Sequence, residues 1–371
     1  MISYWEKAHF LKYDLIVIGA GIVGMSTAIQ YKLKFPQSRI AILERGVFPS
    51  GASTKNAGFA CFGSLTEILD DLNMMSEEEV LALVEKRYQG LLAIRKVFGD
   101  ETLGYQDKGG FELITSQEVS ALDQMNRINK LLMPLFGEDV FSVEKDIYRY
   151  GFGKEVLQVV KNKFEGELDT GKYILALWDK CQQLGIRLHS GAEVLIIDDN
   201  QIHVKEPVTY DVIRFESAKI AICTNAFAKR FFPELDIFPG RGLVMVSKPL
   251  QSKIAWKGAF HYDKGYVYFR EVEGNRLLIG GGRNLDFEGE RTETFEVNSL
   301  LRSYLEKLTR SVVFPDQKVE FEMEWTGIMA FGETKKPIIQ KVSANTVVGV
   351  RLGGMGVAIG WQAGTELVDL L

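Results

Sequence analysis

The pattern of hydrophobic and polar positions predicts a strand, a helix and a second strand near the start of the chain. Apolar runs at residues 15–18 and 40–43 are typical of buried strands, and the stretch between them has helical periodicity. Glycines at Gly19, Gly21 and Gly24 join the first run to the helical stretch. This order is typical of a parallel βαβ unit, and it predicts an α/β fold.

Later segments continue the alternation of helices and strands. Ser76 and Glu79 form a predicted capping box, and Gly99 ends the helix predicted at 76–98. Further helices are predicted at 117–135, 170–184, 295–309 and after residue 356, and further strands at 111–115, 186–189, 192–198, 219–223, 319–325 and 346–350. Glycines and charged residues separate short apolar runs between 237 and 285, which predicts an antiparallel sheet with strands at 243–246, 266–270 and 276–279.

Composition and charge narrow the possible classes of function. The net charge is −5 with acids and bases mixed along the chain, so we expect no nucleic-acid partner. The longest apolar stretch, residues 15–25, is far shorter than the about 20 residues that span a membrane, and no signal-peptide pattern precedes it. The three cysteines and four scattered histidines show no metal-ligand spacing, which predicts reduced thiols, a cytoplasmic location and no metal site.

The glycine turn has the chemistry of a dinucleotide site. Gly19 permits a sharp turn, Gly21 lets backbone N–H groups approach a diphosphate, and Gly24 lets the helix pack closely on the strand. The N-terminus of that helix carries a partial positive charge, which favours a diphosphate. Glu44 follows 20 residues after Gly24, where its carboxylate would bind a ribose diol and repel a 2′-phosphate. These residues predict binding of FAD or NAD and disfavour NADP.

Several separated motifs resemble one family when they are taken together. They are the glycine turn with Glu44 and the segments 51–58, 167–169, 224–226, 239–242, 277–283 and 353–356. In this order and spacing the chain resembles, over essentially its full length, the D-amino-acid oxidase family of FAD-dependent oxidoreductases, which includes glycine oxidase and sarcosine oxidase. The resemblance implies an enzyme with a Rossmann-like FAD-binding domain and a second, substrate domain built on a mostly antiparallel sheet with helices.

Two domains also suit a chain of 371 residues, which is too long for one simple core. The helix and strand predicted between residues 76 and 135 interrupt the nucleotide-binding pattern, and helix followed by strand resumes it near residue 170. We therefore expect a discontinuous FAD-binding domain at 1–75, 155–235 and 325–371, and a substrate domain at 76–154 and 236–324.

The resemblance also implies which residues bind the cofactor. Glu44 would hold the adenosine ribose, Val194 would meet the adenine edge, and the turn at 353–356 would face the flavin ring, where a helix N-terminus stabilises negative charge. The covalent sarcosine oxidases attach flavin through a cysteine whose place Gly327 takes here, so noncovalent FAD is expected. The expected cofactor-binding residues are Gly19, Ala20, Gly21, Ile22, Val23, Gly24, Glu44, Arg45, Ser53, Thr54, Asn56, Ala57, Gly58, Val194, Thr224, Asn225, Gly353, Gly354, Met355 and Gly356.

A small amine or amino acid is the expected substrate. The resemblance implies hydride transfer from its α-carbon to flavin N5, with oxygen, a quinone or another electron carrier as acceptor. Flavoenzymes that exchange hydride with NADH through a second dinucleotide domain carry a second glycine fingerprint. The glycines at 280–282 precede a charged loop and not a helix, so we expect a small organic electron donor. Met329 stands where amino-acid oxidases carry an arginine for the substrate carboxylate. The candidates to bind substrate are Arg241, Tyr266, Tyr268, Arg270 and Arg351, and the sequence identifies no catalytic residue.

Two other functions stay open on the sequence. An FAD-dependent dehydrogenase of a 2-hydroxy acid or polyol phosphate would need a general base, and His261 is the histidine near the substrate-side motifs. A flavin-holding protein without turnover would need no substrate residues. For the substrate candidates themselves, the alternatives are a solvated or ion-paired arginine and a tyrosine that packs against a helix.

Overall fold

The computed structural model describes residues 2–371 and divides the chain into two compact units. The first unit comprises the chain up to Thr54, Thr170–Pro239 and Met329–Leu371, and the second comprises Lys55–Asp169 and Gly240–Ile328. The chain therefore passes between the units after residues 54, 169, 239 and 328, where the sequence predicted passages after 75, 154, 235 and 324. Assignment of the units to FAD and substrate stays a prediction.

The largest difference from the predicted boundaries is at residues 55–75, which belong to the second unit. In this segment β3 (Phe59–Ala60) pairs with β7 (Gly166–Glu167), and both strands lie in the second unit. Helix α4 (Leu65–Leu72) contributes Leu65 and Ile68 to a buried cluster of that unit. The capping box at the start of α4, formed by Ser64 and Glu67, went unrecognised in the sequence.

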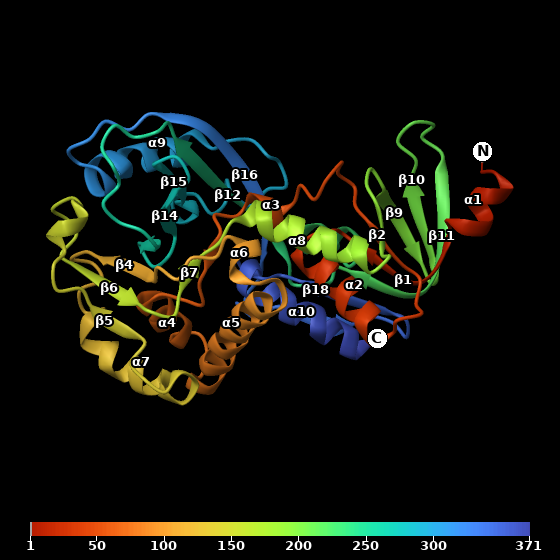
Figure 1. Ribbon diagram of the computed structural model, residues 1–371, viewed down its shortest axis with the longest axis horizontal. Helices are drawn as coiled ribbons and strands as arrows, with labels where there is room; N and C mark the ends of the chain where they lie inside the picture. Colours follow the sequence, from red (N-terminus) through yellow and green to blue (C-terminus); the bar gives the residue numbers. More distant parts are fainter. Residues whose placement is uncertain (1) are drawn as a thin grey trace. The chain divides into compact units, whose positions relative to one another are not determined.

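An eight-stranded sheet forms the frame of the first unit (Figure 1). Its parallel strands, in spatial order, are β18 (Thr346–Val350), β11 (Val212–Ile222), β1 (Lys12–Ile18), β2 (Ile40–Leu43) and β8 (Arg187–His189). Antiparallel strands extend it: β17 (Ile338–Lys341) beside β18, and β10 (Gln201–Lys205) with β9 (Glu193–Asp198) beside β11. The Rossmann-like parallel sheet predicted from the apolar runs is confirmed.

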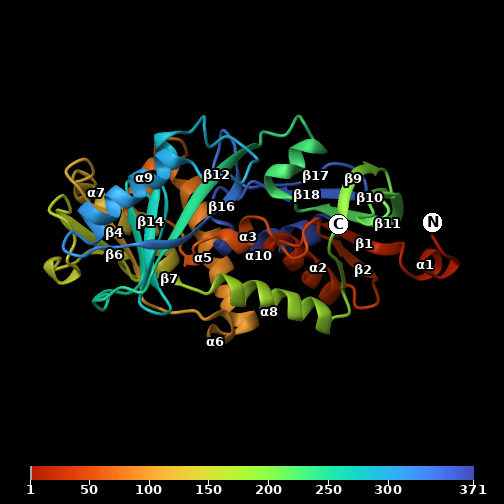
Figure 2. The ribbon, with the colours of Figure 1, turned by 90° about the horizontal axis from the view of Figure 1, so that it is seen from above.

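Three helices of the first unit, α2 (Ile22–Lys34), α8 (Thr170–Gln183) and α10 (Gly356–Leu370), lie on one side of β17 and β18 in Figure 2. Helices α2 and α10 pack closely, since a Cβ on Gly360 would lie 2.5 Å from a methyl carbon of Ile22. Two shorter helices complete the unit, α1 (Tyr4–His9) and the 3₁₀ helix η2 (Asn225–Arg230). Helix α3 (Ala52–Lys55) lies where the chain leaves this unit.

The second unit is also built on an eight-stranded sheet, with the order β16-β12-β15-β14-β13-β4-β6-β5. Its strands are β4 (Gly110–Ile114), β5 (Phe141–Val143), β6 (Gln158–Asn162), β12 (Phe238–Ser247), β13 (Ala259–Tyr262), β14 (Val267–Val272), β15 (Arg276–Gly281) and β16 (Phe321–Phe331). The pairs from β12 to β5 are antiparallel except β13 with β4, which is parallel. The predicted antiparallel character is confirmed.

Helices of the second unit confirm the capping prediction. Helix α5 (Glu77–Phe98) begins after Ser76, whose side chain accepts the N–H of Glu79, and it ends at Gly99. The other helices are α6 (Asp100–Leu103), α7 (Ala121–Phe136), α9 (Ser299–Leu308), the 3₁₀ turns η1 (Tyr148–Tyr150) and η3 (Arg283–Leu285), and the π-helix η4 (Thr309–Val313).

The two faces of this second sheet differ in chemistry, and the difference positions the polar site described below. On one face, Val267 and Phe269 of β14 and Phe260 of β13 join a large aromatic and aliphatic core with α9. Since side chains alternate along a strand, Tyr268 and Arg270 lie on the opposite face, as does His261. Polar and titratable side chains are therefore gathered on the face away from α9.

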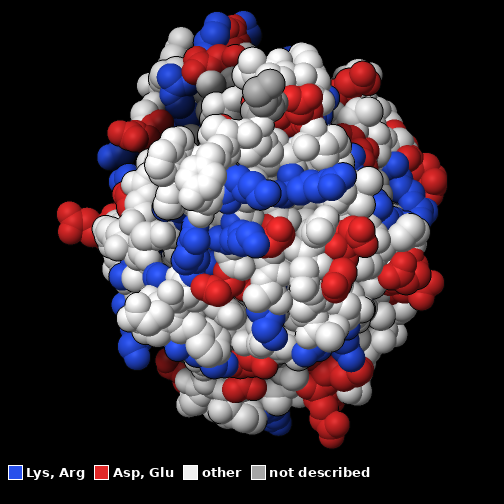
Figure 3. Space-filling view, turned by 90° about the vertical axis from the view of Figure 1, so that its right-hand side faces the viewer, with Lys and Arg blue, Asp and Glu red and all other residues white. Residues whose placement is uncertain are grey.

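Within residues 2–371, no helix is both long and apolar enough to cross a membrane. The face of the molecule drawn in Figure 3 carries lysine and arginine side chains next to aspartate and glutamate. That face is of mixed charge. The cytoplasmic location and the lack of a nucleic-acid partner stay predictions.

Candidate functional site

The glycine turn of the first unit connects β1 to α2 with almost no space for side chains. Gly19 has φ of +97°, and a Cβ on it would lie 2.8 Å from the carbonyl oxygen of Cys223. A Cβ on Gly24 would lie 1.9 Å from the carbonyl oxygen of Gly19. Gly21 is the N-cap residue of α2 and has no side chain to cap it. Backbone N–H groups at this helix start can therefore face an anion directly.

Glu44 lies beside this turn at the end of β2, with 8% of its surface exposed. One carboxylate oxygen accepts the N–H of Ala20 at 3.0 Å and the other accepts the N–H of Gly46 at 2.9 Å. The carbonyl oxygen of Glu44 accepts the N–H of Ala192 at 2.8 Å, two residues before the buried Val194 of β9. The two residues expected at the adenosine end of a dinucleotide therefore lie on adjoining segments.

Ser53 closes the other side of the helix start. Its hydroxyl oxygen accepts the N–H of Ile22 at 3.0 Å and would lie 2.8 Å from a Cβ on Gly21. The hydroxyl of Thr54 donates to the carbonyl of Pro49 at 2.7 Å, which holds the loop before α3 in a turn. The guanidinium of Arg45 lies over the ring of Phe227, 3.9 Å from its centroid. Ser53 thus occupies the place where the resemblance expects a diphosphate contact, while the observed partner of Arg45 is an aromatic ring.

Thr224 and Asn225 follow β11, next to the carbonyl of Cys223 that touches Gly19. The hydroxyl oxygen of Thr224 and the amide oxygen of Asn225 are buried and find no hydrogen-bond partner among residues 2–371. Asn225 has φ of +51°, in the left-handed region that non-glycine residues rarely occupy. Buried polar atoms without partners are uncommon and call for an explanation, such as a ligand that completes them.

A second glycine turn precedes α10 at the end of the chain. Gly353 and Gly354 have φ of +57° and +84°, and Met355 is the N-cap residue without a side-chain hydrogen bond. The sulfur of Met329 lies 3.8 Å from the position of a Cβ on Gly354. Met329, which stands where the resemblance leads us to expect a carboxylate-binding arginine, is therefore next to the turn predicted to face the flavin.

Asn56, Ala57 and Gly58 form a tight loop in the second unit. The side-chain oxygen of Asn56 accepts the N–H of Gly58 at 2.9 Å, and a Cβ on Gly58 would lie 2.2 Å from the carbonyl oxygen of Leu168. The guanidinium of Arg270 donates to the carbonyls of Gly58 at 3.0 Å and Leu168 at 2.9 Å. Arg270 therefore ties this loop to the segment before α8.

The two tyrosine candidates differ in their surroundings. Tyr268 lies on the polar face of β14, edge-on to the ring of Phe59 with centroids 5.5 Å apart, and burial raises the pKa of its hydroxyl to about 12. Tyr266 immediately precedes β14 and packs edge-on against Phe287 with centroids 5.8 Å apart. Their roles in substrate binding stay predictions, and the contacts of Tyr266 favour packing.

Two of the arginine candidates make extensive contacts within the protein. Arg241 donates to both carboxylate oxygens of the buried Glu290, at 3.0 and 2.7 Å. Arg351, 7% exposed, pairs with Asp236 and donates to the carbonyl of Lys336 at 2.9 Å. These contacts favour the ion-paired alternative for both residues, and their roles in substrate binding stay predictions.

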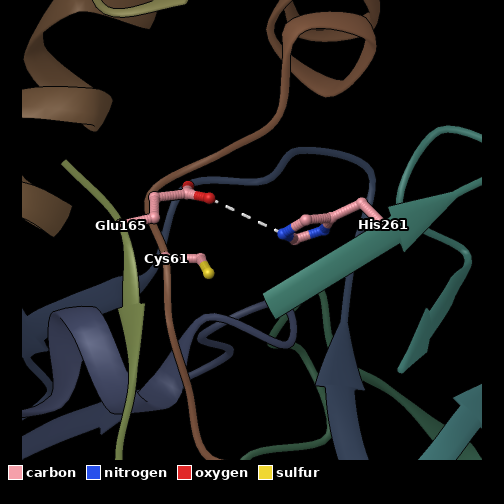
Figure 4. A group of neighbouring side chains, drawn as sticks. All are labelled: Cys61, Glu165 and His261. Atoms are coloured by element: carbon pink, nitrogen blue, oxygen red, sulfur yellow. Dashed lines mark ion pairs between the residues drawn. The ribbon is translucent and has the colours of Figure 1, made fainter. Parts of the chain in front are cut away.

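His261 lies in a buried polar cluster on the face of β13 away from α9. Its Nδ1 is 3.6 Å from a carboxylate oxygen of Glu67, and its Nε2 is 3.6 Å from a carboxylate oxygen of Glu165 (Figure 4). The two carboxylates outweigh the effect of burial and raise the pKa of His261 to about 9. Burial, together with the neighbouring Glu165, raises the pKa of the Cys61 thiol well above its ordinary value.

Sequence reasoning missed most of this cluster. Glu112 lies in β4, a strand whose five residues are all buried, and burial raises its pKa to about 7. It accepts hydrogen bonds from the hydroxyl of Ser64 at 2.8 Å and from the N–H of Thr66 at 3.1 Å. A charged residue inside a continuous apolar strand was the one available signal for Glu112. Cys61 and Glu165 gave no such signal, because their partners are distant in the sequence, and the one local signal for Glu67 was its capping box with Ser64.

Comparison with known proteins places these observations in context. A family model described as FAD dependent oxidoreductase matches residues 14–370. A glycine oxidase from Geobacillus kaustophilus is 25% identical over 350 residues, which are 88% of this chain and 84% of that protein. The bifunctional protein ThiO/ThiG of Synechocystis sp. is 26% identical over 239 residues, 62% of this chain, and the match spans about a third (32%) of its length.

Solved structures show the same fold. The crystal structure of glycine oxidase from Geobacillus kaustophilus aligns with a TM-score of 0.77 at 20% identity, covering 97% of this chain and 94% of that one. The structure of L-proline dehydrogenase from P. horikoshii aligns with a TM-score of 0.75 at 17% identity, covering 97% and 93%. The predicted α/β fold with a Rossmann-like sheet is confirmed.

The residues present in the first unit fit a dinucleotide. Two glycine turns each begin a helix without a side-chain cap, at α2 and at α10. A buried carboxylate lies next to the first turn, and two buried polar atoms without partners follow the neighbouring strand. The N–H groups at the helix starts are hydrogen-bond donors for a diphosphate, and the carboxylate is an acceptor for a ribose diol. The glycines allow the ligand to approach the backbone closely.

Proposed function

We propose, because the chain belongs to the family of FAD dependent oxidoreductases, that it oxidises the C–N bond of a small amine or amino acid. The observation that supports the substrate class most directly is the match over 84% of the length of a glycine oxidase. The proteins with similar structures also include an iminodiacetate oxidase. Cofactor identity follows from the family, while the substrate is our proposal.

The cofactor-binding roles proposed for this chain follow from the first unit. Glu44 holds the ribose diol of the adenosine, and the backbone N–H groups at the start of α2 hold the diphosphate. The N-terminus of α10 stabilises negative charge on the flavin ring. Bound FAD supplies a hydride acceptor at N5, and we propose that it is held noncovalently.

In the proposed reaction the substrate amine would be neutral and would lose a hydride from its α-carbon, for which bound FAD would supply the acceptor. The nitrogen lone pair would form the second bond of a protonated imine, which would release its proton to water, so no strong protein base is required before hydride loss. Water then hydrolyses the imine to a carbonyl compound and ammonia or an amine. Oxygen, a quinone or another electron carrier would accept the two electrons removed from the substrate.

The dehydrogenation of a hydroxy acid or polyol phosphate is less well supported. That reaction removes a hydroxyl proton, for which the sequence offered His261 as general base. Both ring nitrogens of His261 face carboxylates, Nδ1 toward the partly buried Glu67 and Nε2 toward the buried Glu165. Both nitrogens are directed toward acids of the second unit, so nothing in the site favours the C–O reaction over the C–N reaction.

An anaerobic screen tests the proposal. Holoenzyme is mixed with amines, D- and L-amino acids, N-methyl amino acids and hydroxy acids, while the flavin band at about 450 nm is followed. Bleaching by an amine or amino acid is the expected result. Bleaching by hydroxy acids alone would favour the C–O alternative, and a full panel without bleaching would favour a flavin-holding protein. Re-admission of air then separates oxygen from other acceptors.

A further inference from the structure

A compact set of three possible metal ligands lies inside the second unit. Cys61, Glu165 and His261 each place one ligand atom so that the three atoms lie within 4.8 Å of one another. All three residues are buried, and they come from three separate segments of that unit. Figure 4 shows the sulfur of Cys61 and the carboxylate of Glu165 directed toward the imidazole of His261.

Two of these ligand atoms lack hydrogen-bond partners. Glu165 uses one oxygen, Oε1, to accept the backbone N–H groups of Phe62 at 2.8 Å and Gly63 at 2.9 Å. Its other oxygen, Oε2, and Nε2 of His261 are buried without a hydrogen-bond partner among residues 2–371. Buried polar atoms of this kind are costly unless something completes them. The two atoms lie 3.6 Å apart, too far for a good direct hydrogen bond.

The surroundings hold the two ligands in fixed orientations. A Cβ on Gly110 would lie 2.0 Å from Glu165 Oε2, so the carboxylate occupies space that only a glycine leaves open. On the other side of the imidazole, Nδ1 of His261 faces Glu67 Oε2 at 3.6 Å. Glu67 is itself held by the backbone N–H of Ser64 at 2.9 Å. A carboxylate at one ring nitrogen leaves the other nitrogen as the ligand, which is the usual arrangement around a metal-bound histidine.

We propose that Cys61 Sγ, Glu165 Oε2 and His261 Nε2 bind a divalent transition-metal ion of the zinc class, with a fourth position for water. Sulfur, nitrogen and carboxylate oxygen together are a ligand set that zinc prefers over calcium or magnesium. Two ligand atoms at about 2.0–2.1 Å from a tetrahedral ion are about 3.3 Å apart, close to the observed 3.6 Å. The carboxylates of Glu67 and Glu165 supply negative charge for the cation.

The consequence proposed for this site is structural. The ion would join the segment after β3, the segment before β7 and strand β13 within the second unit. Without the ion, the imidazole of His261 lies between the carboxylates of Glu67 and Glu165. The proposal therefore departs from the sequence-based expectation of no metal, which considered ligand spacing only within short stretches.

Metal analysis of the holoenzyme tests the proposal. The protein is incubated with zinc and desalted, and its metal content is measured by inductively coupled plasma mass spectrometry. A parallel sample is incubated with cobalt. We expect about one zinc per chain and, with cobalt, a sulfur-to-cobalt charge-transfer band with visible bands of tetrahedral cobalt. Difference spectra against the chelator-treated sample remove the flavin absorption. Absence of both signals overturns the proposal without any variant being needed.

Variants then locate the ion. Cys61→Ser should abolish the sulfur-to-cobalt band, and His261→Gln should reduce bound zinc at least tenfold. The matched controls Cys181→Ser and His203→Gln alter residues of the first unit and should retain the wild-type zinc content. Zinc that persists in both test variants lies elsewhere and contradicts the assignment. If His261→Gln does not fold, the Cys61→Ser spectrum alone decides, because it replaces one atom.

Discussion

Glu44 accepts the backbone N–H of Ala20 at 3.0 Å, so the carboxylate expected to bind ribose also holds the glycine turn expected to bind diphosphate. The variant Glu44→Gln loses the charge of the acceptor. A hydrogen bond to a charged group typically contributes about 1.5–3 kcal/mol. We predict that FAD binds about 10–100-fold more weakly to the variant. Flavin fluorescence during titration of apoprotein measures the change. Glu216→Gln, an exposed acid on β11 that pairs with Lys12, should bind FAD like the wild type.

The close approach at Gly24 gives a prediction with a matched control. A Cβ there would lie 1.9 Å from the Gly19 carbonyl, so Gly24→Ala should displace the turn and abolish FAD retention on desalting. A Cβ on Gly51 meets nothing within 4 Å, and Gly51→Ala should keep its flavin. Equal flavin content in the two purified variants would contradict the assignment of the turn.

The buried ion pair of Arg241 with Glu290 makes it possible to test whether Arg241 has a structural or a substrate-binding role. Both side chains are buried, and removal of one partner of such a pair typically costs about 3–5 kcal/mol. Arg241→Met should therefore lower the free energy of unfolding by about that amount, and Glu290→Leu added to it should recover much of the loss. Denaturant unfolding measures both. A variant of wild-type stability with a strongly raised KM would instead support the substrate role expected from the sequence.

The buried carboxyl group of Glu112 should make the free energy of unfolding depend on pH. Burial raises its pKa from 4.5 to about 7, so the folded protein binds this proton more tightly than the unfolded chain. The contribution of Glu112 to the free energy of unfolding is greatest below pH 4.5 and falls as the pH rises from 4.5 to 7. Above pH 7 it no longer changes. The total loss is up to about 3 kcal/mol. Glu112→Gln should remove this slope when unfolding is followed from pH 5 to 8 with chelator present, and an unchanged slope would assign it to other groups.

Much of the fold could be predicted from the sequence because its signals are local. The capping box of Ser76 and Glu79, the end at Gly99 and the glycine turn at 19–24 each depend on residues a few positions apart. The passage between the units after Thr54 was not predicted, since it depends on β3 pairing with β7 about a hundred residues later. Local patterns carry no information on such pairing.

The polar cluster of the second unit shows the same limit for the site. His261 was noticed as a histidine near other motifs, but its partners Glu67 and Glu165 are on other segments. Arg241 and Arg351 were selected as cations that could bind the substrate. Their acids, Glu290 and Asp236, could be identified only from the structure. A motif identifies a backbone conformation reliably, whereas the partner of a buried charge is set by tertiary contacts.

The most direct test of amine oxidation compares substrates that differ in one atom. Holoenzyme is mixed anaerobically with the amino acid or amine that performs best, and with the hydroxy compound of the same carbon skeleton, while the flavin band at about 450 nm is followed. The proposed function predicts rapid bleaching by the amine and none by the hydroxy compound. Bleaching by the hydroxy compound as fast as by the amine, or faster, would contradict it.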